Sequence, residues 1–253
     1  FVMLLMFLTL FVSTSVIQVV QADTLAQNPN NKRALYDSYE VQRGAILVGG
    51  VPIALSVPST DVYSFQRVYP DGSIWTPVTG YINPILQSST GIESAMNNVL
   101  SGTAGSQFFS RLERIFTGQA PRGSNVALSL DAAAQAAAVE GLGDLQGAVL
   151  AIEPKTGRIL AMASSPTFDA NLLAVHNADE ALASFAQLEG DASKPLDNRA
   201  IGGNLNPPGS TFKLVVAAAA LASGQYTPDS LLPNPASYLA PQAGSAVRNA
   251  SGT

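Results

Sequence analysis

The first 22 residues restrict what this chain can fold into more than any other feature, because none of them carries a charge. About 20 predominantly apolar residues are enough for a helix to span a bilayer. We therefore expect residues 1–22 to form a single transmembrane anchor in the cell membrane. The alternative is a cleaved signal peptide, since Val20-Gln21-Ala22 has the small-residue pattern of a cleavage site. Since the chain begins at Phe1 rather than at Met, we expect residues upstream of it. Either interpretation places the main part of the chain outside the cytoplasm.

The composition argues against several classes of function. Of the 253 residues, 47% are hydrophobic and 12% are charged, which suits a chain of two domains with real cores. The formal net charge of -5, without any run of like charge, argues against nucleic acid as a partner. With no cysteine, the chain has no thiolate metal site, disulfide or cysteine nucleophile. We interpret His176, the single histidine, as an ordinary loop or helix-end residue, and we expect neither a metal nor a cofactor.

Residues 23–125 are polar and rich in turns, with few long periodic runs. The stretch SIWTPVTGYI (residues 73–82) alternates loosely between apolar and polar, which predicts an edge strand, because Pro77 disfavours a central one. Apolar residues at helical spacing predict two helices, over residues 92–102 and 106–118, each ending on a glycine.

A different pattern begins near residue 125 with NVALSLDAAAQAAAVEGLG. It predicts a short strand, then Asp131 as a helix N-cap, then an alanine-rich helix that Gly141 and Gly143 terminate.

A hairpin is predicted next, over GAVLAIEPKTGRILAMASSP (residues 147–166). Two apolar runs flank a five-residue turn that contains Pro154 and Gly157. Both faces of the strands are apolar, which suits a sheet covered by helices on each side. Residues 178–200 are polar, and we expect a loop or a short helix there.

The most informative stretch is PPGSTFKLVVAAAALA (residues 207–222), which predicts a buried helix with Ser210 at its start. Lys213 follows three residues later and therefore rises from the same face of the helix. A serine hydroxyl is a poor nucleophile until a base removes its proton. A lysine can act as that base when its ammonium is desolvated, and burial in an apolar core would provide this. The competing interpretation is structural, with Ser210 as an N-cap and Lys213 extending to water.

The run PPGSTFK resembles the active-site block of penicillin-binding proteins, the serine transpeptidases that crosslink peptidoglycan, in which S-x-x-K is the first of three signature blocks. The hairpin and the VALSLDAAAQ stretch are similar to the opening of the family's transpeptidase domain. Further upstream, RGAI, YPDGS, TGYI and STGIESAMNNVLSG resemble the N-terminal region of the monofunctional, class B members, and the small actinobacterial ones in particular.

This resemblance implies an architecture of three parts. Residues 1–22 would be the transmembrane helix, residues 23–125 a non-catalytic α+β pedestal, and residues 126–253 part of an α/β (α+β) transpeptidase domain of the penicillin-binding protein and β-lactamase type. It implies that Ser210 is the acylated nucleophile and Lys213 its base. The implied partners are peptidoglycan stem peptides, β-lactam antibiotics, the membrane and a membrane glycan polymerase.

Two of the three signature blocks do not follow Ser210. The S-x-N block does not occur in the sequence, and the single K-T-G, at residues 155–157, precedes the serine in a turn. We interpret this K-T-G as ordinary turn residues. We expect the chain to be truncated soon after the S-x-x-K block, with an incomplete enzyme domain that is inactive alone. Two alternatives stay open: a catalytically inactive membrane scaffold of cell-wall synthesis, and a β-lactam sensor or β-lactamase relative.

Overall fold

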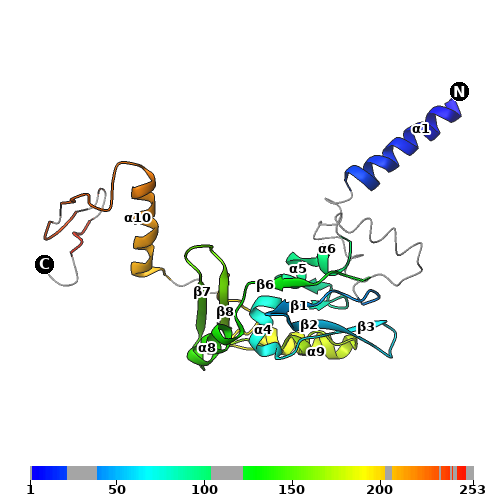
Figure 1. Cartoon of the computed structure of the whole chain (residues 1–253). Coiled ribbons are helices and arrows are strands. Elements are labelled where there is room, and N and C mark those ends of the chain that lie inside the picture. The colour runs from blue at the N-terminus through cyan, green and yellow to red at the C-terminus, as the bar shows by residue number, and fades with distance from the viewer. Residues whose placement is uncertain are drawn as a thin grey trace. The chain divides into compact units, whose positions relative to one another are not determined.

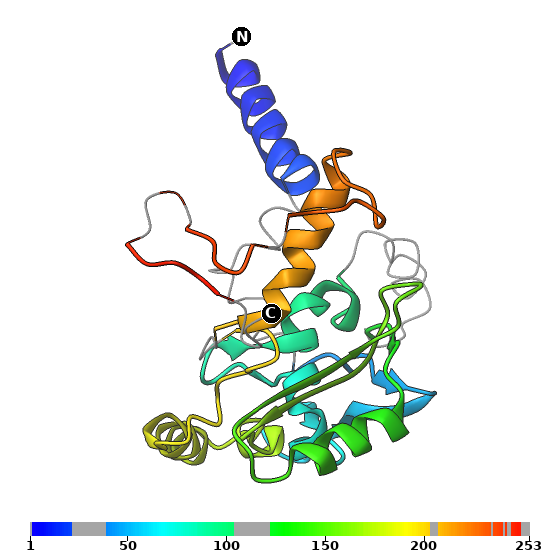
Figure 2. The same cartoon turned by 90° about the vertical axis from the view of Figure 1, so that its left-hand side faces the viewer.

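The computed structural model divides the chain into two compact units, residues 1–205 and residues 206–253. The structure describes residues 2–21, 39–103, 122–202, 207–233, 235–239, 241 and 244–248. The helix predicted over residues 106–118 lies outside these ranges. Figures 1 and 2 show the elements from two sides.

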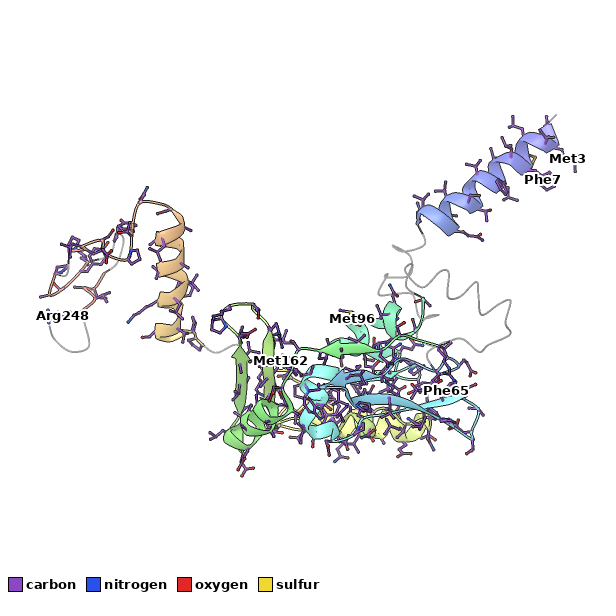
Figure 3. The ribbon with its side chains drawn as sticks, viewed as in Figure 1. Met3, Phe7, Phe65, Met96, Met162 and Arg248 are labelled. Atoms are coloured by element: carbon purple, nitrogen blue, oxygen red, sulfur yellow. The ribbon has the colours of Figure 1, made fainter. Side chains whose placement is uncertain are left out.

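At the N-terminus, α1 (Val2–Ser15) continues into a π-helical turn, η1 (Val16–Val20). The α-helical part has 14 residues, which rise about 21 Å, whereas a hydrocarbon core is roughly 30 Å thick. Among the helices that the structure describes, none is both long and apolar enough to cross a membrane, so the helix predicted to span it over residues 1–22 is not found. The side chains of α1 are exposed, as Met3 and Phe7 illustrate (Figure 3).

A four-stranded sheet with the order β3-β2-β1-β6 lies at the centre of the first unit. Its strands are β1 (Ile46–Val48), β2 (Val51–Pro58), β3 (Phe65–Val68) and β6 (Val126–Leu128). Neighbouring strands β1, β2 and β3 are antiparallel, and β6 runs parallel to β1. Gly49 and Gly50, with φ angles of 57° and 83°, form the two-residue turn between β1 and β2. Such a turn needs positive φ at both positions, which glycine adopts without steric cost.

The strand predicted around Pro77 is wrong, because these residues form the helix α4 (Gly72–Thr79). Trp75 and Val78, three residues apart, face the core on one side of this helix. The proline removes only one hydrogen bond from so short a helix, and two threonine hydroxyls bond back to carbonyls one turn earlier. Thr76 donates to the carbonyl of Gly72 at 2.6 Å, and Thr79 to that of Trp75 at 3.1 Å.

After α4 the chain forms a small antiparallel pair, β4 (Ile82–Asn83) and β5 (Ser88–Ser89). The helix predicted over residues 92–102 is present as two short pieces, α5 (Gly91–Ala95) and α6 (Asn97–Leu100). Met96, between them, has a non-helical φ of -107° and ψ of 21°. Leu100 of α6 is fully buried in the core of this unit.

The predicted cap, helix and hairpin that follow residue 125 are confirmed. Asp131 accepts a hydrogen bond from the Ala134 N–H at 2.8 Å at the start of α8 (Ala132–Leu142), and Gly143 closes that helix with a φ of 49°. The strands β7 (Gly147–Ile152) and β8 (Ile159–Ser165) pair antiparallel. One face of the hairpin packs on α8, as Figure 1 shows, while Leu150 and Ile152 on its other face are about half exposed.

Met162 of β8 belongs to the core of the four-stranded sheet, whereas Ala161 and Ala163 of the same strand pack with α8 in a second cluster. The segment after β8, which includes the short helix η3 (Ala170–Leu172), inserts Phe168 and Leu173 among residues of the sheet and of α4. Residues 178–200, expected to be a loop or a short helix, contain the 13-residue helix α9 (Ala178–Gly190), which packs against the same core. The buried amide of Gln135 exchanges two hydrogen bonds with the backbone of Met162 and also donates to Ile74. These contacts fix α4 against α8 and β8.

Candidate active site

In the second unit, the 3₁₀ turn η4 (Gly209–Thr211) leads directly into α10 (Phe212–Ala222). The structure therefore places Ser210 in the turn that starts the helix and Lys213 in its first turn, as the sequence predicts. Gly209 has a φ of 53°, a conformation that glycine adopts without steric cost, and it turns the chain just before the serine. The Thr211 N–H donates to the Pro208 carbonyl at 3.1 Å within this turn.

The predicted burial of this helix is not found. Phe212, Leu214 and Val215 are all more than half exposed, and no described side chain of α10 is buried. The physical reason is that residues 223–248, as far as the structure describes them, form turns and one isolated bridge, between Tyr238 and Val247, that do not cover the helix. Lys213 is likewise exposed, so the desolvation that a base requires is not provided by the described residues of this unit.

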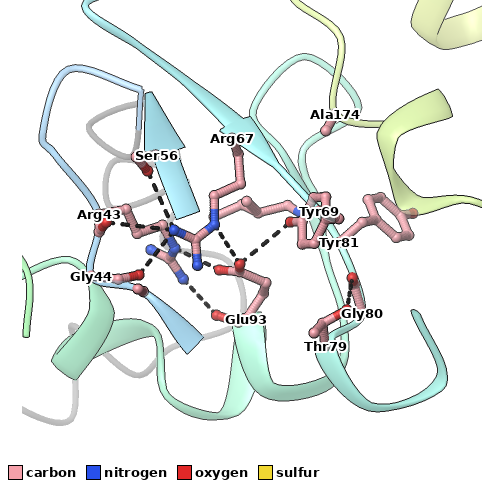
Figure 4. Close-up of polar contacts among 12 residues, drawn as sticks. Arg43, Gly44, Ser56, Arg67, Tyr69, Thr79, Gly80, Tyr81, Glu93 and Ala174 are labelled. Atoms are coloured by element: carbon pink, nitrogen blue, oxygen red, sulfur yellow. Dashed lines mark hydrogen bonds and ion pairs between the residues drawn. The ribbon is translucent and has the colours of Figure 1, made fainter. Parts of the chain in front are cut away.

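Three charged side chains that are far apart in the sequence meet inside the first unit (Figure 4). Glu93 accepts from the Nε atoms of Arg43 at 2.6 Å and Arg67 at 2.7 Å, and all three side chains are at most 1% exposed. Each guanidinium also donates a hydrogen bond from Nη1. Arg43 donates to Oδ1 of Asn97 at 2.7 Å, and Arg67 donates to the Gly44 carbonyl at 2.9 Å. The cluster has more positive than negative groups, yet it is enclosed by protein. We interpret the cluster as a buried ion-pair network that stabilises the first unit.

Electrostatics agree with an ionised cluster. Burial by itself would raise the pKa of Glu93, but the guanidiniums of Arg67 and Arg43 outweigh it and hold that pKa below its ordinary value of 4.5. Burial, with a contribution from the charge of Glu93, raises the pKa of Tyr69 well above 10.0. The Tyr69 hydroxyl therefore stays protonated and lies 3.4 Å from the Glu93 carboxylate, to which it donates.

His176, expected to be an ordinary loop or helix-end residue, contacts one carboxylate and two tyrosine rings. Its Nδ1 lies 2.5 Å from the Asp61 carboxylate, and its ring makes a tilted contact with Tyr39 and an edge contact with Tyr63, at centroid distances of 4.4 and 4.8 Å. Within the described ranges, no group of three or more metal-ligating side chains comes together.

The K-T-G of residues 155–157 lies in the turn between β7 and β8. Gly157 has a φ of 73°, and the Thr156 hydroxyl donates to the carboxylate of Glu153 within the same turn. These are the contacts of a tight turn, in agreement with the interpretation of this triplet as turn residues.

A pocket of about 430 Å³ lies within the first unit, between the end of α4, the end of β8 and residues 195–202. Pro77, Tyr81, Phe168 and Phe185 supply apolar parts of its wall, and Asn198 is among its polar residues. Sequence reasoning missed both this pocket and the buried arginine–glutamate cluster. Each is assembled from segments that are distant in the sequence, and a sequence pattern does not report such pairings.

Comparisons with known proteins agree with the motifs. Residues 43–126 match the family described as the penicillin binding protein A dimerisation domain, and residues 147–250 match the penicillin binding protein transpeptidase domain. The chain is 42% identical over 220 residues to the peptidoglycan D,D-transpeptidase PbpA of Mycobacterium tuberculosis. The aligned region covers 85% of this chain and 44% of that protein. It is 30% identical over 208 residues to the peptidoglycan D,D-transpeptidase MrdA of Escherichia coli, covering 70% and 32%.

Solved structures give the same picture. The crystal structure of PBPA from Mycobacterium tuberculosis matches with a TM-score of 0.72 at 39% identity, covering 85% of this chain and 49% of that one. The imipenem acyl-enzyme complex of the same penicillin-binding protein matches with a TM-score of 0.73, also at 39% identity, over 86% of this chain and 50% of that one. The chain thus spans less than half the length of the curated relatives.

Proposed function

Because the chain belongs to the class B family of penicillin-binding proteins, we propose that it carries the nucleophile of a serine D,D-transpeptidase that crosslinks peptidoglycan. The observation that carries the proposal is the position of Ser210 and Lys213 at the start of α10, inside the match to the transpeptidase domain. The buried cluster, the His176–Asp61 pair and the pocket belong to the first unit, whereas Ser210 and Lys213 belong to the second.

The reaction would proceed in two steps. Lys213 accepts the proton of the Ser210 hydroxyl, and the Oγ atom attacks the carbonyl of the penultimate D-alanine of a donor stem peptide. The peptide bond to the terminal D-alanine breaks, and that residue leaves with a proton. An amino group of a second stem peptide then attacks the acyl ester: the new peptide bond forms, the ester bond to Oγ breaks, and the proton lost by the amine passes through Lys213 to the Ser210 oxygen.

The helix start contributes to stabilisation of the transition state. The backbone N–H of Ser210 would form half of an oxyanion hole for the negative charge that develops on the carbonyl oxygen. β-Lactams would acylate Ser210 in the place of the donor. This is supported by the PBPA of Mycobacterium tuberculosis, which has been solved as acyl-enzyme complexes with imipenem and with penicillin G.

The finer organisation is part of the same proposal. We assign residues 1–22 to a membrane anchor, residues 23–125 to a non-catalytic pedestal and residues 126–253 to the transpeptidase domain. The catalytic part would lie outside the cytoplasm, where a membrane glycan polymerase would supply the strands to be joined.

Release of the terminal D-alanine tests this function directly. The full-length protein, given stem pentapeptide donors and an amine acceptor, should release D-alanine and form a crosslinked product. Tetrapeptide donors, which lack the terminal residue, are the matched control and should give neither. A folded full-length protein that acts on neither donor would contradict the transpeptidase and favour the scaffold. Rapid hydrolysis of penicillin without crosslinking would favour the β-lactamase relative.

A further inference from the structure

The pocket at the end of α4 has no part in the proposed function. It has a volume of about 430 Å³ and lies between the end of α4, the end of β8 and residues 195–202, all within the first unit. Folded proteins contain few internal voids larger than a water molecule, and small-molecule sites commonly measure about 300–1,000 Å³. The volume is therefore that of a site for a small molecule rather than that of a packing gap.

One side of the pocket is built by two backbone segments in direct contact. Gly80 and Gly91, with φ angles of 63° and 56°, both line it. A Cβ atom on Gly80 would clash with the Thr90 carbonyl, so the two segments approach as closely as backbones can. Tyr81 joins them, because its carbonyl accepts from the Thr90 N–H at 3.0 Å and its N–H donates to the Thr90 hydroxyl at 3.2 Å. This wall is formed before any ligand binds.

Contacts across the pocket hold its other side in place. Asn198 lines the pocket and donates from Nδ2 to the carbonyl of Pro77 at 2.6 Å. The buried ring of Phe168 meets the ring of Tyr81 edge-on, at a centroid distance of 6.1 Å. Pro77 and Tyr81 come from α4 and the residues after it, whereas Phe168 and Asn198 follow β8. A pocket whose walls are joined in this way needs little ordering when a ligand enters, and so loses little affinity to that cost.

The lining combines aromatic rings with one charge. Tyr81, Phe168 and Phe185 supply aromatic surface, and Asp197 has the single charged side chain among the described residues of the lining. In the part of the chain that the structure describes, no group donates a hydrogen bond to the Asp197 carboxylate or forms an ion pair with it. The guanidinium of Arg199 instead bonds to the backbone carbonyl of Asp197, at 3.3 Å. A carboxylate without a partner attracts a cation by its charge, and aromatic rings add a cation–π contribution.

We propose that this pocket binds a small organic cation, namely an ammonium group carried on an apolar body about as large as one aromatic side chain. The ammonium group pairs with the Asp197 carboxylate, and the body packs against Tyr81, Phe168 and Phe185. An anionic ligand would meet no basic side chain among the described residues of the lining. The inference does not depend on the proposed role of Ser210, because every residue that carries it belongs to the first unit.

The test compares three probes on the full-length protein: 2-phenylethylamine, its neutral analogue 2-phenylethanol, and methylamine, which keeps the charge but lacks the apolar body. Dissociation constants come from ligand-observed NMR titrations at about 150 mM salt, which screens the general attraction of an acidic protein for cations. We expect 2-phenylethylamine to bind with a dissociation constant of about 1 mM, the range for so small a ligand. Each of the other two probes should bind at least about fivefold more weakly.

Two variants locate the charge that matters. Asp197→Asn removes the carboxylate and keeps the shape of the side chain, so it should weaken the binding of 2-phenylethylamine at least about fivefold, to the level of the alcohol. Asp144→Asn is the matched control, because it removes the same charge at an exposed position outside the lining. Its affinity for the amine should stay within about twofold of that of the wild type.

Several results would overturn the inference. Folded wild type that does not bind the amine below about 10 mM, or that binds the amine and the alcohol equally, would show that the pocket does not select a cation. Equal affinities in Asp197→Asn and wild type would exclude the pairing with Asp197. Equal weakening by Asp197→Asn and Asp144→Asn would mean a general attraction to the acidic protein. Methylamine bound as tightly as 2-phenylethylamine would mean that the aromatic lining contributes nothing.

Discussion

Replacing Lys213 by methionine should slow the acylation of the protein by benzylpenicillin by a factor of about 10² to 10⁴. Methionine keeps the length and the apolar stem of lysine but cannot accept the proton of the Ser210 hydroxyl. Without a base, that hydroxyl stays a weak nucleophile at neutral pH. The measurement is the rate at which the penicilloyl adduct forms in the full-length protein, followed by intact mass.

Lys155→Met is the control for this variant, because Lys155 belongs to the K-T-G of the hairpin turn. Its rate should equal that of the wild type. If Lys155→Met lost acylation and Lys213→Met kept it, the assignment of the base would be wrong and the turn triplet would have a catalytic role after all.

Glu93→Gln should lower the free energy of unfolding by about 3–5 kcal/mol, because it removes the counter-charge of two buried guanidiniums. Arg43 and Arg67 are each 1% exposed, so water cannot replace the lost carboxylate. Denaturant unfolding of the full-length protein measures this loss. Glu189→Gln, at an exposed position on α9, should change the free energy of unfolding by less than about 0.5 kcal/mol. If Glu93→Gln lowered the free energy of unfolding no more than Glu189→Gln does, the interpretation of the cluster as a stabilising ion-pair network would be contradicted.

The wild type and Glu93→Gln should also differ in how their stability changes as the pH is lowered. The pKa of Glu93 is lower in the folded protein than its ordinary value of 4.5, so folding is favoured by the ionised carboxylate. That stabilisation is fully present above pH 4.5 and is lost as the pH falls from there through the folded pKa. The wild type should lose stability more steeply than Glu93→Gln in this range, because glutamine has no proton to bind.

Local signals in the sequence predicted local structure well. Asp131 and Gly143 marked the ends of α8, Pro154 and Gly157 marked the hairpin turn, and the glycine before Ser210 marked the start of a helix. Each signal acts through contacts between residues a few positions apart. The turn at Gly49-Gly50 and the strands beside it were not predicted.

Features that depend on distant partners were not accessible in this way. The stretch around Pro77 alternates like a strand, yet it is helical because Trp75 and Val78 pack on one side into a core built by other segments. Glu93 gave no sign of its two arginines, which lie 50 and 26 residues before it. The burial of α10 was inferred from its composition, but burial requires a covering surface that the described residues of its unit do not provide.

The central claim is that Ser210 is an acylated nucleophile, and intact mass after incubation with benzylpenicillin tests it most directly. The full-length protein should gain a single penicilloyl group, which peptide mapping should place on Ser210. The Ser210→Ala variant should gain none, while Thr211→Val, which removes the neighbouring hydroxyl, should be labelled like the wild type. An unlabelled wild type that is folded and complete, or a label that persists in Ser210→Ala, would contradict the account and leave Ser210 as an ordinary residue of the turn η4.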